Sequence, residues 1–213
     1  MQIDSGEIHP GQFAGGRVVV AYDCDVLGNS QASGMDSIED PECGLDGGKM
    51  LTRICLGDPD TVSMLEATAK AIDSLAERKL IAMVEPFLSV RENGKVRNDL
   101  SANAVIKSVA IAEGLGSTSA YTWMKLPVVA EMERVMAAAT MPTVLLGGDP
   151  EGTQDEVFAS WQAALALPGV RGLTVGRTLL YPQDGNVVGA VATAASLLRT
   201  GRHNNDAMEG EQQ

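Results

Sequence analysis

From residue 49 onward, short apolar segments alternate with longer stretches in which apolar residues recur at helical spacing. This alternation is typical of βα units, and it predicts a parallel sheet with helices packed on it. The predicted strands cover residues 49–56, 81–88, 121–127, 143–146 and 172–175. The predicted helices cover residues 58–79, a segment beginning at Ser101, residues 128–139, a segment capped by Thr153 and Glu156, and residues 187–198. The pattern therefore contains five clear βα units.

Successive predicted strands begin about 20 to 40 residues apart, which is the repeat length of a (β/α)8 barrel of about 250 residues. Residues 1–48 contain one further strand candidate, 17–22, and otherwise consist of Gly-, Asp- and Ser-rich sequence typical of loops. We therefore expect an incomplete α/β fold of the (β/α)8 TIM-barrel type with at most six strands. Because such a sheet leaves an unpaired edge, two explanations stay open: a truncated barrel, or a barrel completed by a partner chain.

The chain divides into three parts by composition. Residues 1–44 form a poorly defined N-terminal segment with one possible strand, residues 45–199 hold the barrel units, and residues 200–213 are polar and charged. A segment of this last kind cannot bury enough apolar surface to fold, so we expect the tail to be disordered.

The 213 residues carry a formal net charge of −12. Such a surface repels nucleic acid and anionic lipid, so a phosphate group is expected to bind only in a local cationic pocket. This favours a phosphorylated small molecule as the partner, rather than nucleic acid or a membrane. The longest apolar stretches are too short or too rich in small residues to span a bilayer, and the N-terminus shows no signal-peptide pattern. We therefore expect a cytoplasmic protein.

Histidine and cysteine usage narrows the possible chemistry. The two histidines, His9 and His203, lie in the terminal segments, so a His-ligated metal site or a Ser-His-Asp triad is not expected. Cys24, Cys43 and Cys55 show no CxxC spacing and predict reduced thiols rather than disulfides or a zinc site. We expect no metal and no cofactor, and chemistry that depends on Lys, Glu, Asp, Arg, Tyr or backbone groups.

Lys125 is the leading candidate for a catalytic side chain. It lies near the carboxyl end of the predicted strand 121–127, and strand alternation places it on one face with Tyr121 and Trp123. Among apolar neighbours the pKa of a lysine falls, and the free amine can attack a carbonyl to form an imine. The alternative is a lysine that extends to the barrel rim or pairs with a carboxylate.

Two further charged positions lie on neighbouring strands. Glu85 is a carboxylate inside an otherwise apolar strand, and beside Lys125 it could relay protons during imine chemistry. A structural ion pair between the two is the competing interpretation. Lys49 and Arg53 share one face of the first strand, where a cationic pair needs an anion such as a substrate phosphate or Glu85. Alternatively, both hold loops at the barrel mouth.

Glycine pairs follow the last two predicted strands. Gly147-Gly148 and Gly176-Arg177 occupy the positions where late barrel loops bind phosphate through backbone N–H groups, and the arginine adds charge. Strand-ending glycines are also common turn residues, so the specificity comes from their pairing on consecutive strands. The polar segment 91–99 is expected to be a loop at the same end of the barrel.

Several segments between about residues 45 and 198 resemble a known enzyme family. They are Gly48-Lys49-Met50-Leu51, Met83-Val84-Glu85-Pro86, Met124-Lys125-Leu126-Pro127-Val128, Leu145-Leu146-Gly147-Gly148 and Thr174-Val175-Gly176-Arg177. Together they resemble the class I tagatose-bisphosphate aldolase family and a related group of aldolase-like barrel proteins, some linked with inositol catabolism or labelled as deoxyribose-phosphate aldolases.

The resemblance implies roles for individual residues. It implies that Lys125 forms the Schiff base, that Glu85 is the acid and base, and that Lys49 lines the site. The phosphate-binding positions it implies are Gly147, Gly148, Gly176 and Arg177. The family has three further βα units at the front, where this chain has a short glycine-rich segment.

We therefore expect a metal-independent carbon-carbon lyase. It would cleave a phosphorylated keto sugar or keto acid to a triose phosphate and an aldehyde. The alternatives are a non-catalytic sugar-phosphate-binding barrel or subunit completed by a partner, and another Schiff-base enzyme such as a dehydratase or transaldolase. An exposed barrel edge favours a homo-oligomer or a partner-completed barrel.

Overall fold

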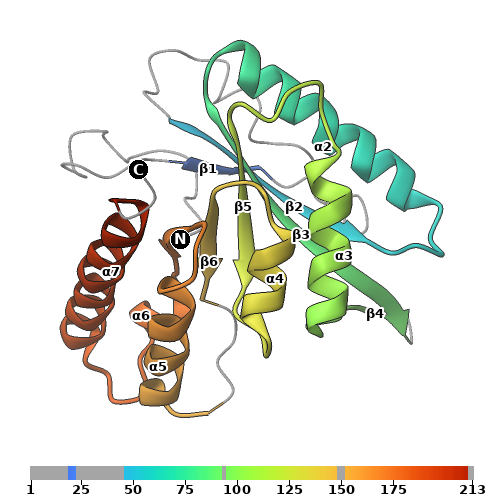
Figure 1. The fold of residues 1–213 in the computed structure, drawn as a ribbon. Coiled ribbons are helices and arrows are strands. Elements are labelled where there is room, and N and C mark those ends of the chain that lie inside the picture. Colours follow the sequence, from blue (N-terminus) through green and yellow to red (C-terminus); the bar gives the residue numbers. More distant parts are fainter. Residues whose placement is uncertain (1–18, 23–45, 93–94, 148–151, 211–213) are drawn as a thin grey trace.

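The computed structural model describes residues 19–22, 46–92, 95–147 and 152–210, with the backbone alone for 19–22 and 200–210. Strands and helices alternate along most of this part of the chain (Figure 1). In chain order the elements are β1 (Val19–Tyr22), β2 (Gly47–Ile54), α2 (Asp60–Glu77), β3 (Ile81–Glu92), β4 (Lys95–Asn98), α3 (Ala102–Glu113), β5 (Thr122–Pro127), α4 (Met132–Ala138), β6 (Thr143–Leu146), α5 (Gln154–Leu165), β7 (Val170–Thr174), α6 (Arg177–Leu180) and α7 (Val187–Gly210).

The strands form one sheet in the order β1-β2-β3-β5-β6-β7, and all neighbours along this path are parallel. The predicted α/β fold of parallel βα units is thus confirmed, with six parallel strands in the described part of the chain. Strands β1 and β7 form the two edges, and no described strand joins them into a closed barrel.

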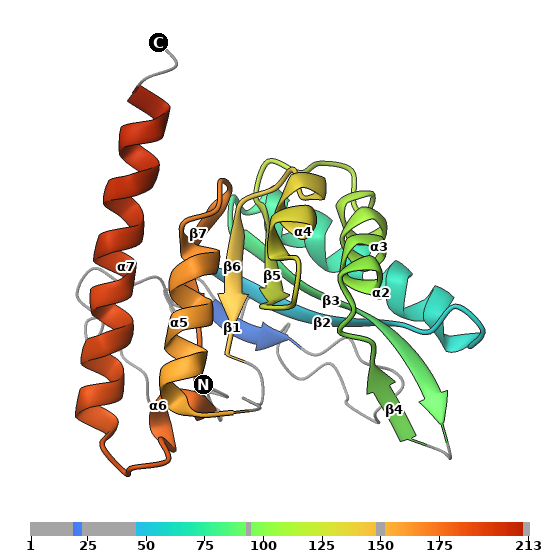
Figure 2. The same ribbon diagram turned by 60° about the horizontal axis from the view of Figure 1, so that its bottom comes forward.

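The two faces of the sheet differ in character. Side chains such as Met50, Val84 and Met124 point toward helices α2, α3 and α4, which lie along one side of the strands (Figure 2), and they form the main hydrophobic core with them. Alternate residues, including Glu85 and Lys125, occupy the opposite face, which we call the inner face. The period of two in a strand produces this division.

Helix starts follow local capping chemistry. The Ser101 side chain accepts a hydrogen bond from the Ala104 N–H at the start of α3. Thr153 and Glu156 form the predicted capping box at the start of α5. At α2, the Asp58 carboxylate accepts a hydrogen bond from the backbone N–H of Asp60.

The segment 91–99, expected to be a loop, is instead part of a β-hairpin. Strand β3 continues to Glu92 and pairs antiparallel with β4, in a register that places Ser89 opposite Asn98. The sequence Asn93-Gly94 between the two strands is the dipeptide most typical of two-residue hairpin turns, so the signal was present in the sequence.

The C-terminal helix also differs from the prediction. Helix α7 runs to Gly210, so residues 200–210 continue a helix where a disordered tail was expected. Packing explains its start, because Ala190 and Ala194 are buried and α7 contacts α5. No helix in the described part of the chain is long and apolar enough to cross a membrane.

Candidate active site

Three charged side chains meet on the inner face, one from each of three adjacent strands. Glu85 of β3 lies between Lys49 of β2 and Lys125 of β5. A single carboxylate oxygen, Glu85 Oε2, is 3.0 Å from Lys49 Nζ and 3.2 Å from Lys125 Nζ. The structure therefore brings together the three residues that the sequence proposed as catalytic.

Strand register accounts for this meeting. The Cα partner of Glu85 on β2 is Leu51, and the partner of Lys49 is Met83, so Lys49 starts one inner-face position closer to the amino end. Its long side chain extends toward the carboxyl end to reach the carboxylate. On the other side, Met83 pairs with Trp123, and continuing this register places Glu85 level with Lys125.

The three groups are shielded from most solvent. The side chains of Lys49, Glu85 and Lys125 are 17%, 12% and 15% exposed. Apolar side chains on the same face pack beside them and toward the amino ends of the strands. We call this set the inner apolar cluster: Ile81, Met83, Trp123 and Val144.

Burial and charge act in opposite directions on Lys125. Desolvation lowers the pKa of its ammonium, the Glu85 carboxylate raises it through charge and a hydrogen bond, and the Lys49 ammonium lowers it again. The net result is a pKa below the usual lysine value. With both lysines protonated, the trio carries an excess positive charge. This excess favours either a neutral amine at Lys125 or a bound anion.

The loops after β6 and β7 touch one another. The Thr178 hydroxyl donates a hydrogen bond to the Gly147 carbonyl at 3.4 Å. A β-carbon at Gly147 would lie 3.1 Å from Val175 Cγ1 and 3.2 Å from Thr178 Oγ1, which leaves little room for any side chain. Glycine at this position therefore permits the close approach of the two loops.

The other candidate phosphate ligands adjoin this contact in the chain, lie on β2, or fall outside the described residues. Gly176 precedes the short helix α6, and Arg177 is its first residue and is exposed. Gly148 falls outside the described residues. Arg53 lies one inner-face position beyond Leu51 toward the carboxyl end of β2 and is partly buried.

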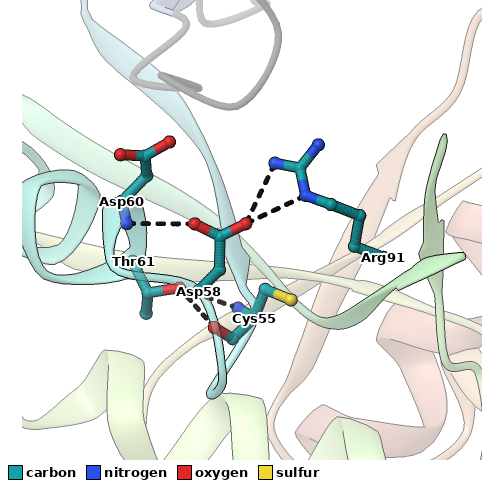
Figure 3. Close-up of polar contacts among 5 residues, drawn as sticks. All are labelled: Cys55, Asp58, Asp60, Thr61 and Arg91. Carbon is teal, nitrogen blue, oxygen red and sulfur yellow. Dashed lines mark hydrogen bonds and ion pairs between the residues drawn. The ribbon is translucent and has the colours of Figure 1, made fainter. Parts of the chain in front are cut away.

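A second polar group at the carboxyl ends of β2 and β3 was not predicted (Figure 3). Asp58 Oδ2 is 2.9 Å from Arg91 Nη2 and 3.0 Å from Arg91 Nε, which connects the β2–α2 loop to the β3–β4 hairpin. The Thr61 hydroxyl donates to the Cys55 carbonyl at 2.7 Å and accepts from the Cys55 N–H at 3.1 Å. Cys55, Asp58 and Arg91 border an open pocket of about 470 Å³. Sequence could not reveal the group, because the contact joins residues 33 positions apart.

Comparison with known proteins identifies relatives of the chain. A family profile described as Cgl0159-like matches residues 25–195. The solved structure of Cgl0159 from Corynebacterium glutamicum is 54% identical, with a TM-score of 0.78 over 86% of this chain and 64% of that chain. The present chain therefore spans less than two thirds of the length of that protein. A search of curated proteins finds no match.

More distant solved structures show the fold class. An archaeal fructose-1,6-bisphosphate aldolase is 16% identical, with a TM-score of 0.61 over 84% of this chain and 77% of that chain. A Schiff-base-forming fructose-1,6-bisphosphate aldolase is 21% identical, with a TM-score of 0.60 over 79% of this chain and 63% of that chain. These similarities support an aldolase-like (β/α)8-type fold, but not membership of the tagatose-bisphosphate family or the inositol-linked group. The extent of the profile match shows that the chain belongs to the Cgl0159-like family.

Proposed function

We propose that this chain acts as a class I, Schiff-base aldolase in which Lys125 is the nucleophile. The observation that carries the proposal is the poorly solvated Lys125 amine, 3.2 Å from Glu85 and with a lowered pKa. A lysine of this kind offers more free amine at neutral pH than an exposed one. The proposed substrate is a phosphorylated keto sugar or keto acid, and the products are a triose phosphate and an aldehyde.

The proposed reaction begins with attack of the neutral Lys125 amine on the substrate ketone, which gives a carbinolamine. Glu85, which holds the proton it took from the Lys125 ammonium to free the amine, donates that proton to the departing hydroxyl, and loss of water gives a protonated imine and the Glu85 carboxylate. The Glu85 carboxylate then takes the proton of the substrate hydroxyl at the bond to be broken. That carbon-carbon bond cleaves, the aldehyde leaves, and the electron pair moves into the iminium to form an enamine. Protonation and hydrolysis release the triose phosphate and restore the amine.

Lys49 is proposed to hold Glu85 in position. Its ammonium lies 3.0 Å from the oxygen that also contacts Lys125, so it orients that oxygen. The same charge disfavours protonation of Lys125. Lys49 is therefore expected to support both proton transfer and nucleophilic attack without itself bonding to substrate.

Phosphate binding is proposed for the contacting loops at the carboxyl ends of β6 and β7. The contact between Thr178 and Gly147 shows that the two loops lie close together, at the end of the strands where late barrel loops bind phosphate. The proposed ligands are Gly147, Gly148, Gly176, Arg177 and, from β2, Arg53.

The chemistry of two solved structures of similar fold motivates this assignment. The archaeal aldolase holds its catalytic lysine covalently bound to the carbinolamine intermediate of its substrate, and the second aldolase forms a Schiff base. At these identities the likeness concerns the fold. The step from fold to chemistry rests on Lys125, Glu85 and Lys49 in this chain.

Borohydride trapping tests the proposal directly. The purified protein is incubated with dihydroxyacetone phosphate, reduced and analysed by peptide mass spectrometry. We expect one reduced adduct on Lys125, abolished in Lys125→Met and retained in Lys70→Met, which removes an exposed lysine on α2. A folded wild-type protein that gives no adduct on Lys125 would contradict the proposal.

A second candidate is a phosphate-binding subunit without catalysis, completed by another chain. The edges β1 and β7, which no described strand joins, favour it. It predicts phosphate binding without trapping, and light scattering would show a hetero-assembly with a partner or a homo-oligomer.

A dehydratase or transaldolase would give the same adduct and is distinguished by product analysis. We also propose a cytoplasmic location and, from the net charge of −12, neither nucleic acid nor membrane as partner.

A further inference from the structure

The inner apolar cluster joins the three strands around Lys125. Trp123 precedes Lys125 by two residues on β5 and therefore shares its face. Its Cα partner on β3 is Met83, and the Cα partner of Lys125 on β6 is Val144. Ile81, Met83 and Val144 are buried, and Trp123 packs against them. The lysine therefore has apolar groups along its own strand and on a neighbouring strand.

In the part of the chain that the structure describes, charged groups from β2 and β3 form the ion pairs around Lys125. Glu85 faces it from β3 and Lys49 from β2, whereas β6 (Thr143–Leu146) has no titratable residue. Helix α3 contacts β5 through the opposite face of the sheet, where its buried residues are Ala, Val and Ser. Among the described residues, the neighbours of Lys125 on β6 and next along its own face of β5 are thus apolar, and the larger of the two side chains is the Trp123 indole.

We propose that Trp123 is a positioning residue of this site: its indole closes the inner apolar cluster beside Lys125 and keeps water away from the lysine amine. The effect on catalysis rests on the proposed function, but the effect on the amine does not. Desolvation is the largest cause of the lowered pKa of Lys125, which agrees with this geometry. Replacement of the indole by a small side chain admits water and stabilises the ammonium.

Competitive acetylation of lysines tests the inference without any substrate. Trace acetic anhydride is reacted with the protein over a series of pH values, and labelling of Lys125 is compared by mass spectrometry with that of the exposed Lys70. In Trp123→Ala we expect the labelling of Lys125 at neutral pH to fall by about tenfold relative to Lys70, whereas Trp123→Phe retains most of it. Trp161→Phe, which alters the other tryptophan between α5 and α7, is the matched control and should leave Lys125 unchanged.

A second variant covers the case in which Trp123→Ala does not fold. Val144→Thr preserves shape but places a hydroxyl on the strand position paired with Lys125, so it should reduce Lys125 labelling in the same direction. If Trp123→Ala folds and its Lys125 is labelled to the same extent as in the wild type, the inference is overturned. If Trp123→Ala does not fold, wild-type labelling of Lys125 in Val144→Thr overturns it.

Imine trapping separates this inference from the proposed function. If both hold, the pH profile of trapping with dihydroxyacetone phosphate moves to higher pH in Trp123→Ala, in step with acetylation. If acetylation changes but wild-type Lys125 traps no adduct, the inference stands and the aldolase proposal fails. If trapping occurs and its pH profile is the same in both proteins, the aldolase proposal stands and the role of Trp123 is refuted.

Discussion

Replacing Glu85 with glutamine separates imine formation from bond cleavage. The amide keeps the size of the carboxylate and its ability to accept a hydrogen bond, but it removes the negative charge that lies 3.2 Å from Lys125 Nζ. Both the charge of Glu85 and its hydrogen bond raise the pKa of Lys125. Glu85→Gln should therefore lower that pKa further and increase the free amine at neutral pH.

The size of the effect follows from the geometry. Two unit charges at this separation attract by about 1.3 kcal/mol in bulk water and by about 5 kcal/mol at an effective dielectric constant near 20. The Lys125 side chain is only 15% exposed, so the attraction lies nearer the second value, and about 2 kcal/mol is a lower bound for it. Loss of about 2 kcal/mol of this attraction in Glu85→Gln corresponds to a roughly thirtyfold increase in the fraction of Lys125 that is free amine, at pH values below the midpoint of its titration. Cleavage should fall by about 100- to 10,000-fold, because proton transfer loses its acid and base.

The assay compares two measurements on the same variant. Borohydride trapping is recorded against pH, and its acid limb should move to lower pH in Glu85→Gln. Release of aldehyde from a phosphorylated ketose should be nearly lost. Glu66→Gln, on the exposed side of α2, is the matched control and should change neither. A trapping profile that stays in place or moves to higher pH would refute the charge relationship between Glu85 and Lys125.

Three further predictions concern local structure. In Gly147→Ala a β-carbon would press on the loop after β7. The variant should therefore have a free energy of unfolding lower by about 1 to 3 kcal/mol, and inorganic phosphate should be a weaker competitive inhibitor of it. Unchanged inhibition would contradict phosphate binding at this loop. Thr153→Ala should cost about 1 kcal/mol in a urea titration, because the α5 cap is lost. The pKa of Asp58 is lowered, first by the hydrogen bond from the Asp60 N–H and then by Arg91. The Asp58 carboxylate therefore contributes to stability above the usual aspartate range, and this contribution is lost as the pH falls through the lowered pKa. Melting curves of wild type and Asp58→Asn should differ at neutral pH and converge in strong acid.

Much of the fold could be predicted because it depends on local signals. Alternating apolar segments indicated the order of the strands and helices from β2 onward except β4 and α6, and the capping box at Thr153 and Glu156 indicated the start of α5. The hairpin of β3 and β4 was missed although its turn dipeptide was in the sequence. The length of α7 was missed because the polarity of residues 200–210 indicated disorder rather than a continuing helix.

By itself, the sequence determined which residues share a strand face, because side chains alternate with a period of two. Lys49, Glu85, Trp123 and Lys125 could therefore be assigned to faces of their own strands. Only the tertiary structure decided that both lysines contact the same oxygen of Glu85, and that Asp58 lies against Arg91. Register between strands and packing between loops are non-local, so the charge balance that lowers the pKa of Lys125 exists only after the strands have paired.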